Sequence, residues 1–347
     1  MADYAMGYSA VDLTREVNRL PTTYGLLNAM NIAPISRKKS TYVRIDVKDG
    51  IVRVLGSRER GAPGQTIERG KENAIIIEIP HFPVLDQILV DDPDNLLEVV
   101  GGKLVPASVD QELLRTLQTI RRSHSLTLEY LRLGMLRGEV VDGDGNQLLD
   151  LYDAFDINKK TINFQLNKPD TDVRAKCAEL QKHTRDNLMN ETQSGVEAVV
   201  STEFFDALIS HQNVEKYVVN AQNSRLHSTV EDYALGGVYG RMFKFGNITF
   251  REYAGSMPVK ENEKTKQAPI IDAGVGHSFP TGTGNLMHTF AAPALHVDSI
   301  NQPAKQIDDV KISIEPLKHG KGWELESQSN RIAVCNQPQV LAELQAE

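Results

Sequence analysis

Residues 122–155 read RSHSLTLEYLRLGMLRGEVVDGDGNQLLDLYDAF and join a periodic apolar segment to a turn rich in Asp and Gly. The periodic segment starts upstream, at an acidic first turn with Asp110 and Glu112, and its apolar side chains recur every three or four residues. This spacing traces one face of an α-helix. The sequence therefore predicts a helix of about 28 residues that starts at this acidic first turn and is about 40 Å long at about 1.5 Å per residue. Its predicted apolar face consists of Leu113, Leu117, Ile120, His124, Leu128, Leu131 and Met135.

The polar and glycine residues of this helix carry three further expectations. His124 stands inside the apolar face, where a histidine is expected to be packed or hydrogen-bonded and not to be a ligand. Gly134 and Gly138 are expected to mark the fraying end of the helix. The remaining polar side chains are predicted to lie away from the apolar face: Arg115, Gln118, Arg122, Glu129 and Arg132.

The Asp-Gly turn after the helix raises the question of a calcium loop. An EF-hand loop needs oxygen ligands at positions 1, 3 and 5, glycine at position 6 and glutamate at position 12. Asp142, Asp144 and Asn146 match the first three, but position 6 is Gln147 and position 12 is Asp153. The flanking segments GEVV and LLDLYDAF have the composition of two strands joined by an Asx-Gly turn. We therefore predict a β-hairpin over residues 138–155 and no metal site.

Composition sets the broad class. The chain has 347 residues, of which 40% are hydrophobic and 24% charged, as expected for a globular protein with two or more cores. No stretch approaches the ~20 apolar residues that cross a bilayer, and the N-terminus lacks a signal-peptide pattern, so a soluble cytoplasmic protein is expected. Cys177 and Cys335 lie far apart and are expected to be reduced packing residues. The net charge of −8 argues against a nucleic-acid binder that recognises sequence.

Charge alternates in blocks along the first part of the chain. Residues 37–71 hold ten Lys and Arg against four Asp and Glu, residues 72–112 hold nine acidic residues against one Lys, and residues 113–137 hold five Arg against one Glu. Blocks of alternating sign suit surfaces that meet complementary surfaces, within the fold or on a second copy, and they also suit solvated faces without a partner. The sequence leaves both interpretations open.

The basic block has the pattern of a long two-stranded hairpin. Polar and apolar side chains alternate over residues 42–48, a turn follows at KDG, and IVRVLGSRER (51–60) returns from it. Glycine and proline residues then interrupt the pattern before it resumes near residue 73. A ribbon of this length is only marginally stable alone, so we expect it to lie on another surface. Upstream, residues 12–20 predict two helical turns ended by Pro21, and residues 21–36 predict an extended arm without a partner of its own.

The rest of the chain predicts a mixed α+β fold without βαβ alternation or an internal repeat. Residues 168–190 have helical spacing, opened by Pro169 and Asp170, and residues 195–221 predict a strand and one or two short helices. Residues 271–295 are dense in glycine and predict a loop region at the surface. Strands are predicted within residues 239–256 and 309–344.

No set of residues in the sequence assembles a catalytic, cofactor or metal site. The glycine-rich tract at residues 274–284 lacks the GK[ST] of a phosphate loop, and no HExxH pattern frames His277 or His288. The sequence therefore predicts a protein whose function is carried by surfaces, with no enzyme activity and no cofactor. An enzyme with a site at residues 274–296 is an alternative that a bound ligand or metal in that region would support.

The order of these elements resembles the lambda-type (E family) major capsid protein of tailed bacteriophages. After the arm, the charged hairpin and the acidic stretch, LRGEVVDGDGNQLLDLYDAF (136–155) is similar to the family's helix end and the hairpin that follows it. ITFREYAGSM (248–257) and FPTGTGNLMHTFAAPA (279–294) resemble two later family segments, and SQSNRIAVCNQPQVLAEL (327–344) resembles its C-terminal part. The resemblance spans nearly the whole chain.

This resemblance implies a Hong Kong 97-like capsid fold and a function in self-assembly. Copies would form the hexamers and pentamers of an icosahedral phage head that encloses double-stranded DNA without recognising its sequence. Scaffold, portal and decoration proteins would be partners, and no membrane would be involved. The location would be the virion, after assembly in the host cytoplasm. The implied domains are an N-terminal arm at 1–36, an extended loop at 37–80, a peripheral domain at 81–170 and 310–347 with its spine helix at 109–137, and an axial domain at 171–309.

Two points about assembly complete these expectations. Arg53, Arg58 and Arg60 of the extended loop are the candidate assembly residues. We expect the basic loop to rest on an acidic surface of a neighbouring copy, such as residues 72–112, because the charges are opposite. An encapsulin-like or other self-assembling compartment protein shares the implied fold and remains an alternative to the phage head.

Overall fold

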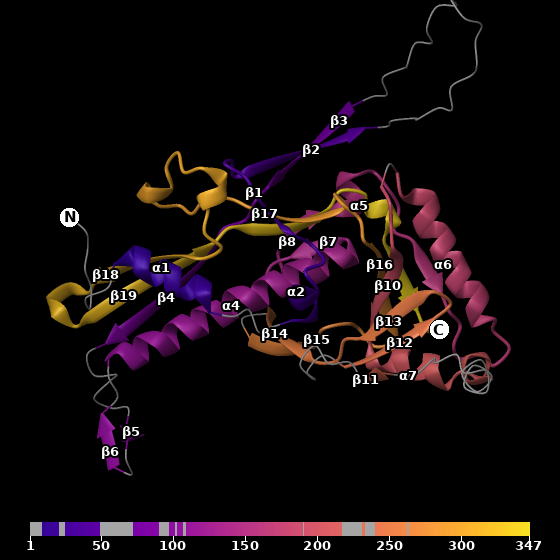
Figure 1. Cartoon of the computed structure of the whole chain (residues 1–347), viewed down its shortest axis with the longest axis horizontal. Helices are drawn as coiled ribbons and strands as arrows, with labels where there is room; N and C mark the ends of the chain where they lie inside the picture. Colours follow the sequence, from indigo (N-terminus) through magenta and orange to yellow (C-terminus); the bar gives the residue numbers. More distant parts are fainter. Residues whose placement is uncertain are drawn as a thin grey trace, which may run out of the picture.

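The computed structural model describes residues 9–20, 25–48, 72–89, 97–100, 103–106, 109–189, 191–216, 231–232, 240–261 and 264–347. Its longest element, helix α4 (Val109–Arg137), runs across the body of the molecule (Figure 1). A three-stranded sheet lies near the start of this helix and a seven-stranded sheet lies near its end. The α+β class predicted from the sequence is confirmed.

Helix α4 begins and ends at the predicted residues, and all seven members of its predicted apolar face are buried. The first half of the helix is amphipathic, whereas residues 131–136 are buried on every side. Gly134 lies in this buried part and does not mark a fraying end, so that prediction is wrong. A Cβ at Gly134 would lie 2.8 Å from the carbonyl oxygen of Glu139, because strand β7 (Glu139–Val141) packs directly on the helix. Gly138, with φ +89°, allows the chain to turn from the helix into β7.

Near the start of α4, strands β18 (Lys311–Pro316), β19 (Gly322–Ser329) and β4 (Phe82–Leu89) form an antiparallel sheet in that order. Helix α1 (Ala10–Arg19) packs beside β18 and against α4 (Figure 1). Ser9 and Asp12 form a capping box that starts α1. These elements share one apolar cluster: Leu13, Val17, Ile88, Leu113, Leu117, Ile120, Val310, Ile312, Ile314 and Leu325.

The middle of the molecule holds a small sheet against α4. Strand β17 (Met287–Ala291) pairs antiparallel with β20 (Arg331–Cys335) and parallel with β1 (Ile35–Arg37). Helix α2 (Leu26–Met30) lies on α4 with its leucines, Leu26 and Leu27, fully buried. Residues 25–37 therefore pack within their own chain. The prediction of an arm without a partner is wrong for these residues, because their apolar side chains are buried against α4 and the central core.

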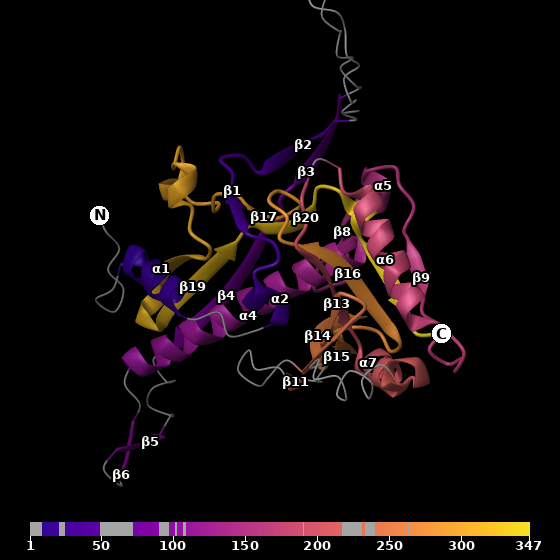
Figure 2. The same ribbon diagram turned by 45° about the vertical axis from the view of Figure 1, so that its right-hand side comes forward.

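The seven-stranded sheet forms the other end of the body. Its order is β11 (Glu231–Asp232), β12 (Arg241–Phe245), β13 (Ile248–Glu252), β10 (Gly195–Val200), β16 (Val275–Thr281), β21 (Ala342–Gln345) and β9 (Thr161–Asn163). The sheet is mixed, since β10 pairs parallel with β13 and antiparallel with β16. Helices α6 (Val173–Asn187) and α7 (Thr202–Ser210) share an apolar cluster with one face, and the end of α4 packs on the other (Figure 2). Phe164, Phe204 and Phe250 form an aromatic group in that first cluster.

The glycine-dense tract over residues 271–295 is not a surface loop, contrary to the prediction. It contains β16, which is the neighbour of β10 inside the large sheet, and β17, which is the middle strand of the small sheet. A Cβ at Gly276 would lie 2.5 Å from Cγ1 of Val200 on the adjacent strand. Here glycine permits close packing inside a strand, whereas the prediction took it as a turn signal.

The predicted hairpin at residues 138–155 is confirmed for its two strands, β7 and β8 (Gln147–Asp150). Asp142 closes the turn by accepting hydrogen bonds from the backbone amides of Asp144 and Asn146. Leu151–Ala154 form a short helix, α5, capped by the side chain of Asp150, and do not extend the second strand. Helix α6 likewise begins later than predicted, because Asp172 caps it.

Strands β2 (Tyr42–Lys48) and β3 (Glu72–Glu78) are the described part of the predicted long hairpin, and they pair antiparallel. The remaining short elements are β5 (Leu97–Val100), β6 (Lys103–Pro106), β14 (Ser256–Glu261), β15 (Lys264–Pro269), η1 (Val297–Ser299), η2 (Ala304–Gln306), η3 (Lys318–Gly320) and η4 (Pro338–Val340).

Candidate assembly surfaces

The predicted extended loop presents one described surface, which is the outer face of β2 and β3. Val43, Ile45 and Ile77 on the inner face of these strands are buried in the central core, so the base of the hairpin lies on its own chain. Tyr42 and Ile76 point to the other face and are 53% and 70% exposed. Both strands project beyond the body (Figure 1). The candidate assembly residues Arg53, Arg58 and Arg60 lie outside the described residues, and their role stays a prediction, as does the pairing of basic loop and acidic surface.

A second surface is the loop at residues 293–307, between β17 and β18. Leu295, Val297 and Ile300 of this loop are 79%, 77% and 68% exposed. The loop is nevertheless attached to β19: the Leu295 amide donates to Oε1 of Gln328 at 2.8 Å, and Nε2 of Gln328 donates to the Leu295 carbonyl at 3.2 Å. Three large apolar side chains are therefore displayed together on a loop whose backbone is tied to the sheet. A set of this kind marks a contact site on many soluble proteins.

The outer face of the three-stranded sheet combines apolar and acidic groups. Leu85 and Leu89 of β4 are exposed there. Gln87 lies between them and donates to Glu324 of β19 at 2.8 Å. Glu315 of β18 is the cross-strand neighbour of Glu324 and is exposed as well. This face suits a partner that brings apolar and basic side chains.

Beneath these surfaces, a buried carboxylate joins α4 to the N-terminal segment. Each oxygen of Glu129 accepts a backbone hydrogen bond at 2.7 Å, one from Leu27 and one from Asn28. The hydroxyl of Tyr253 donates to Glu129 Oε1 at 2.6 Å and accepts from the Leu26 amide at 3.2 Å. Burial raises the pKa of Glu129, and the bonds from Tyr253 and the two amides act in the opposite direction. The first turn of α2 is thereby fixed to the spine helix.

One turn further along α4, Arg132 holds the other end of the same segment. Its guanidinium donates to the Ala33 carbonyl at 2.7 Å and to Oδ1 of Asn28 at 2.9 Å. Thr289 of β17 donates to the same Ala33 carbonyl at 2.9 Å. Glu129 and Arg132 lie away from the predicted apolar face, as expected, and both are nevertheless buried because the N-terminal segment covers this side of the helix. Their partners lie about a hundred residues upstream, which periodicity within the helix does not reveal.

Two buried histidines are neutral parts of the packing. Nε2 of His124 lies 3.1 Å from Oγ of Ser327, which confirms the expectation of a hydrogen-bonded histidine. Burial lowers its pKa to about 3, and Arg331 acts in the same direction. His277 lies in β16, and burial followed by the charge of Arg137 lowers its pKa to about 3 as well. Neither ring is placed to accept a proton near neutral pH.

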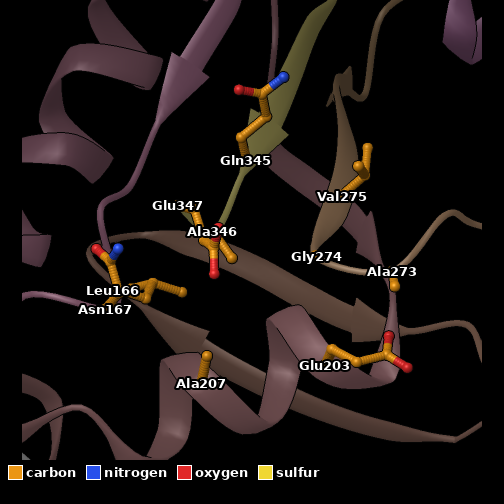
Figure 3. Close-up of a pocket in the computed structure, with 10 residues that line it drawn as sticks. All are labelled: Leu166, Asn167, Glu203, Ala207, Ala273, Gly274, Val275, Gln345, Ala346 and Glu347. Carbon is orange, nitrogen blue, oxygen red and sulfur yellow. The ribbon is translucent and has the colours of Figure 1, made fainter.

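A hollow of about 570 Å³ opens where β21 ends beside α7 (Figure 3). Its lining carries two carboxylates, Glu203 and Glu347, and two amides, Asn167 and Gln345, and the other residues are aliphatic or glycine. Glu203 and Glu347 lie on different sides of the hollow in Figure 3.

The two histidines of the tract at residues 274–296 lie on different sheets. His277 is in the seven-stranded sheet and His288 is in the small sheet. Cys177 and Cys335 are buried, and burial raises the pKa of each thiol to about 12. Among the described residues no group of three or more His, Cys, Asp or Glu is placed to hold a metal. In the same part of the chain no helix combines the length and apolarity needed to span a membrane.

The fold of this chain is similar to that of solved phage capsid proteins. A crystal structure described as a capsid protein of a prophage of E. coli CFT073 superimposes with a TM-score of 0.62 at 10% identity, over 99% of this chain and 100% of that one. The capsid protein of Cyanophage P-SCSP1u gives a TM-score of 0.50 at 12% identity, over 91% of this chain and 86% of that one. At such identities the likeness shows the fold, which is the Hong Kong 97-like fold that the sequence resemblance implied.

Sequence comparison then gives the family. The model of the family "Phage major capsid protein E" matches residues 9–346, and the chain belongs to this family. The major capsid protein of Salmonella phage Felix O1 is 26% identical over 360 residues, covering 97% of this chain and 95% of that protein. The major capsid protein of Pseudomonas phage KPP10 is 27% identical over 344 residues, covering 96% and 95%. The chain is thus a structural protein of the virion that acts as many copies of itself.

Proposed function

We propose that copies of this chain form the hexamers and pentamers of an icosahedral phage head that encloses double-stranded DNA. The observation that carries the proposal is the family match over residues 9–346. The net charge of −8 suits a shell that encloses DNA without recognising its sequence. Scaffold, portal and decoration proteins are the further partners in this proposal. The shell is built in the host cytoplasm without a membrane, and the chain performs no enzymatic reaction.

We also propose that the subunit has the arm, extended loop, peripheral domain and axial domain of its family. Two apolar clusters support this division, because one joins α1, the first half of α4 and the three-stranded sheet, and the other joins α6 and α7 to the seven-stranded sheet. Two adjustments to these boundaries are part of the proposal, and the packing supports them. Residues 25–36 belong with the spine helix and not with the arm at 1–36. Strands β9 and β21 pair inside the large sheet, so they belong with the axial domain at 171–309.

The contacts between copies are proposed at the exposed surfaces described above. Each square ångström of apolar surface removed from water contributes about 25 cal/mol, so Leu295, Val297 and Ile300 favour burial under a neighbouring copy. The outer face of β2 and β3 displays Tyr42 and Ile76 for the same purpose. The residues Arg53, Arg58 and Arg60 are proposed to bring positive charge to an acidic neighbour.

Size-exclusion chromatography with light scattering tests the proposal on the purified chain, alone and co-expressed with its scaffold. The proposal predicts species of five or six copies and particles of far larger mass. A mass of one or two copies under every condition would contradict it.

A further inference from the structure

Helix α1 lies along the free edge of β18 and bonds to it through two side chains. Oγ1 of Thr14 donates to the Ile312 carbonyl at 3.2 Å and accepts from the Ile312 amide at 3.0 Å. Asn18 repeats this arrangement at Val310, where Nδ2 donates to the carbonyl at 2.8 Å and Oδ1 accepts from the amide at 3.2 Å. Four hydrogen bonds between α1 and this edge therefore satisfy the backbone of Ile312 in β18 and of Val310, the residue directly before the strand.

The fit depends on two repeat lengths that nearly agree. Residues i and i+4 of an α-helix lie about 6 Å apart along its axis, and residues i and i+2 of a strand lie about 6.7 Å apart. Val310 and Ile312 turn their amides and carbonyls to the same side of the strand, away from β19. Thr14 meets Ile312 and Asn18 meets Val310, which is the order that an antiparallel strand would give. Helix α1 thus takes the place of a fourth strand.

The composition of α1 indicates that the polar pair Thr14 and Asn18 is present to hydrogen-bond with the edge of β18. Leu13 and Val17, each one residue before a bonding side chain, are buried in the cluster beneath the helix. They hold α1 in place by apolar contact. Thr14 and Asn18 are weak helix formers, so apolar residues there would raise both helix propensity and buried apolar area. Thr14 and Asn18 instead supply hydrogen-bond partners for backbone groups on the free edge of β18.

We propose that α1 guards a strand-accepting edge and keeps β18 of a free subunit from pairing with an extended strand of a second copy. A strand with unpaired backbone groups is a template for strand addition by another chain. A chain that gathers identical copies at high local concentration meets this hazard most often. The inference concerns the free subunit and does not depend on the geometry of the head.

The test replaces the bonding groups and keeps the apolar ones. The variant Thr14→Val with Asn18→Leu removes all four hydrogen bonds and leaves Leu13 and Val17 in place. Its matched control, Arg15→Ala with Glu16→Ala, changes two exposed side chains of the same helix. All proteins are studied as full chains, in a buffer that keeps the parent protein as free subunits. Sedimentation velocity follows association, and amide hydrogen exchange follows the β18 edge.

If α1 protects this edge, copies of the Thr14/Asn18 variant associate with one another as concentration rises, while copies of the control and of the parent protein do not. In its dilute monomer, the amides of Val310 and Ile312 should exchange about tenfold faster than in the control. They should regain protection on association, because a strand of the second copy then pairs with them. A variant that exposes these amides and still stays monomeric at every concentration overturns the proposal.

A second measurement tests the proposal if the Thr14/Asn18 variant fails to fold. Loss of folding would change the fluorescence of Trp323, the single tryptophan, which packs against the apolar cluster beneath α1. Native-state hydrogen exchange of the parent protein in rising denaturant then replaces the comparison. The proposal predicts that the amides of Val310 and Ile312 exchange together with those of α1 and before Ile332 in the core. If they stay protected while α1 opens, another group covers the edge and the guard is excluded. Particle formation is scored separately, so failure here leaves the shell proposal untouched.

Discussion

Glu129 of the spine helix and Tyr253, directly after strand β13, share a hydrogen bond of 2.6 Å inside the body of the subunit. The same carboxylate accepts the first amides of α2, so one side chain connects the N-terminal segment, the long helix and the seven-stranded sheet. We therefore expect these three parts to move as one unit.

Replacing Glu129 by glutamine tests whether its hydrogen bonds hold these three parts together. A carboxamide offers one oxygen where three donors converge, and its NH2 group faces donors. We expect the free energy of unfolding to fall by about 1–3 kcal/mol, measured as a lower midpoint in denaturant. The matched control is Glu112→Gln at the start of the same helix, where the ion pair with Arg115 is near the surface and the change should stay within about 0.5 kcal/mol. An equal loss of unfolding free energy in both variants would show that the hydrogen bonds of Glu129 do not hold these three parts together.

Gly25 allows a separate test of the same contact. Its φ of +99° favours glycine, and a Cβ there would collide with the carboxylate of Glu129. Gly145 has a similar φ of +85°, but a Cβ there has nothing within 4 Å. Gly25→Ala should therefore lower the thermal midpoint clearly more than Gly145→Ala, since only the first adds a collision to the backbone strain. Similar midpoints for the two variants would show that Glu129 adapts without cost.

The buried histidines predict a loss of stability in mild acid. The pKa of His124 and that of His277 fall from an ordinary 6.5 to about 3 in the folded state. The unfolded chain therefore binds protons first, so this contribution to stability is complete above about pH 6.5 and is lost progressively as the pH falls toward 3. Thermal midpoints at a series of pH values should follow this course.

A variant pair separates this effect from general destabilisation. His277→Leu should flatten the pH dependence, because one of the two groups no longer titrates. Ser278→Ala removes a buried hydrogen bond to the Ala342 carbonyl and should lower the midpoint by a similar amount at every pH. A His277→Leu variant with the slope of the parent protein would show that this residue is not a source of the acid sensitivity.

The loop at residues 293–307 contains a matched pair of isoleucines. Ile300 is exposed and Ile307 is 3% exposed. Ile300→Ser should leave the thermal midpoint of the subunit nearly unchanged and reduce the yield of assembled particles, because it removes apolar area that a neighbouring copy would cover. Ile307→Ser should lower the midpoint of the subunit itself. Normal particle yield from Ile300→Ser combined with Leu295→Ser would exclude this loop as a contact.

Charge reversal tests the predicted assembly residues of the extended loop. Arg53→Glu, Arg58→Glu and Arg60→Glu together should leave the subunit folded and stop shell formation, because they place acidic groups against an acidic neighbour. Lysine at the same three positions keeps the charge and should still give particles. Electron micrographs that show normal particles from the glutamate variant would reject the role of these arginines.

Much of the fold follows from patterns that are local in sequence. The spacing of apolar residues predicts the long helix α4, and the Asp142 turn follows from its Asx and glycine residues. Glu129 and Gly276 show where local patterns stop. A polar side chain in a helix looks solvent-facing until its backbone partners are known, although Gly25 before two leucines is a signal that the segment packs closely. A glycine in a strand looks like a turn until its neighbour, Val200, is known.

Some of the assembly surfaces could be predicted from the sequence and others could not. The charged hairpin is visible in the alternation of residues 42–48. The triad Leu295, Val297 and Ile300 was not predicted, because exposure depends on how β17 and β18 leave the loop outside the sheet. The polar pair Thr14 and Asn18 also escapes sequence analysis, since the edge that it covers lies almost three hundred residues away.

Electron microscopy of the assembled product is the most direct test of whether copies of this chain form a shell. The purified chain, alone and with its scaffold, is imaged after the buffer is changed to favour association. If copies of this chain form the head, the images show closed shells or capsomer rings whose subunit density fits the long helix and the seven-stranded sheet. Only single or paired subunits, in every condition and with the scaffold present, would contradict it.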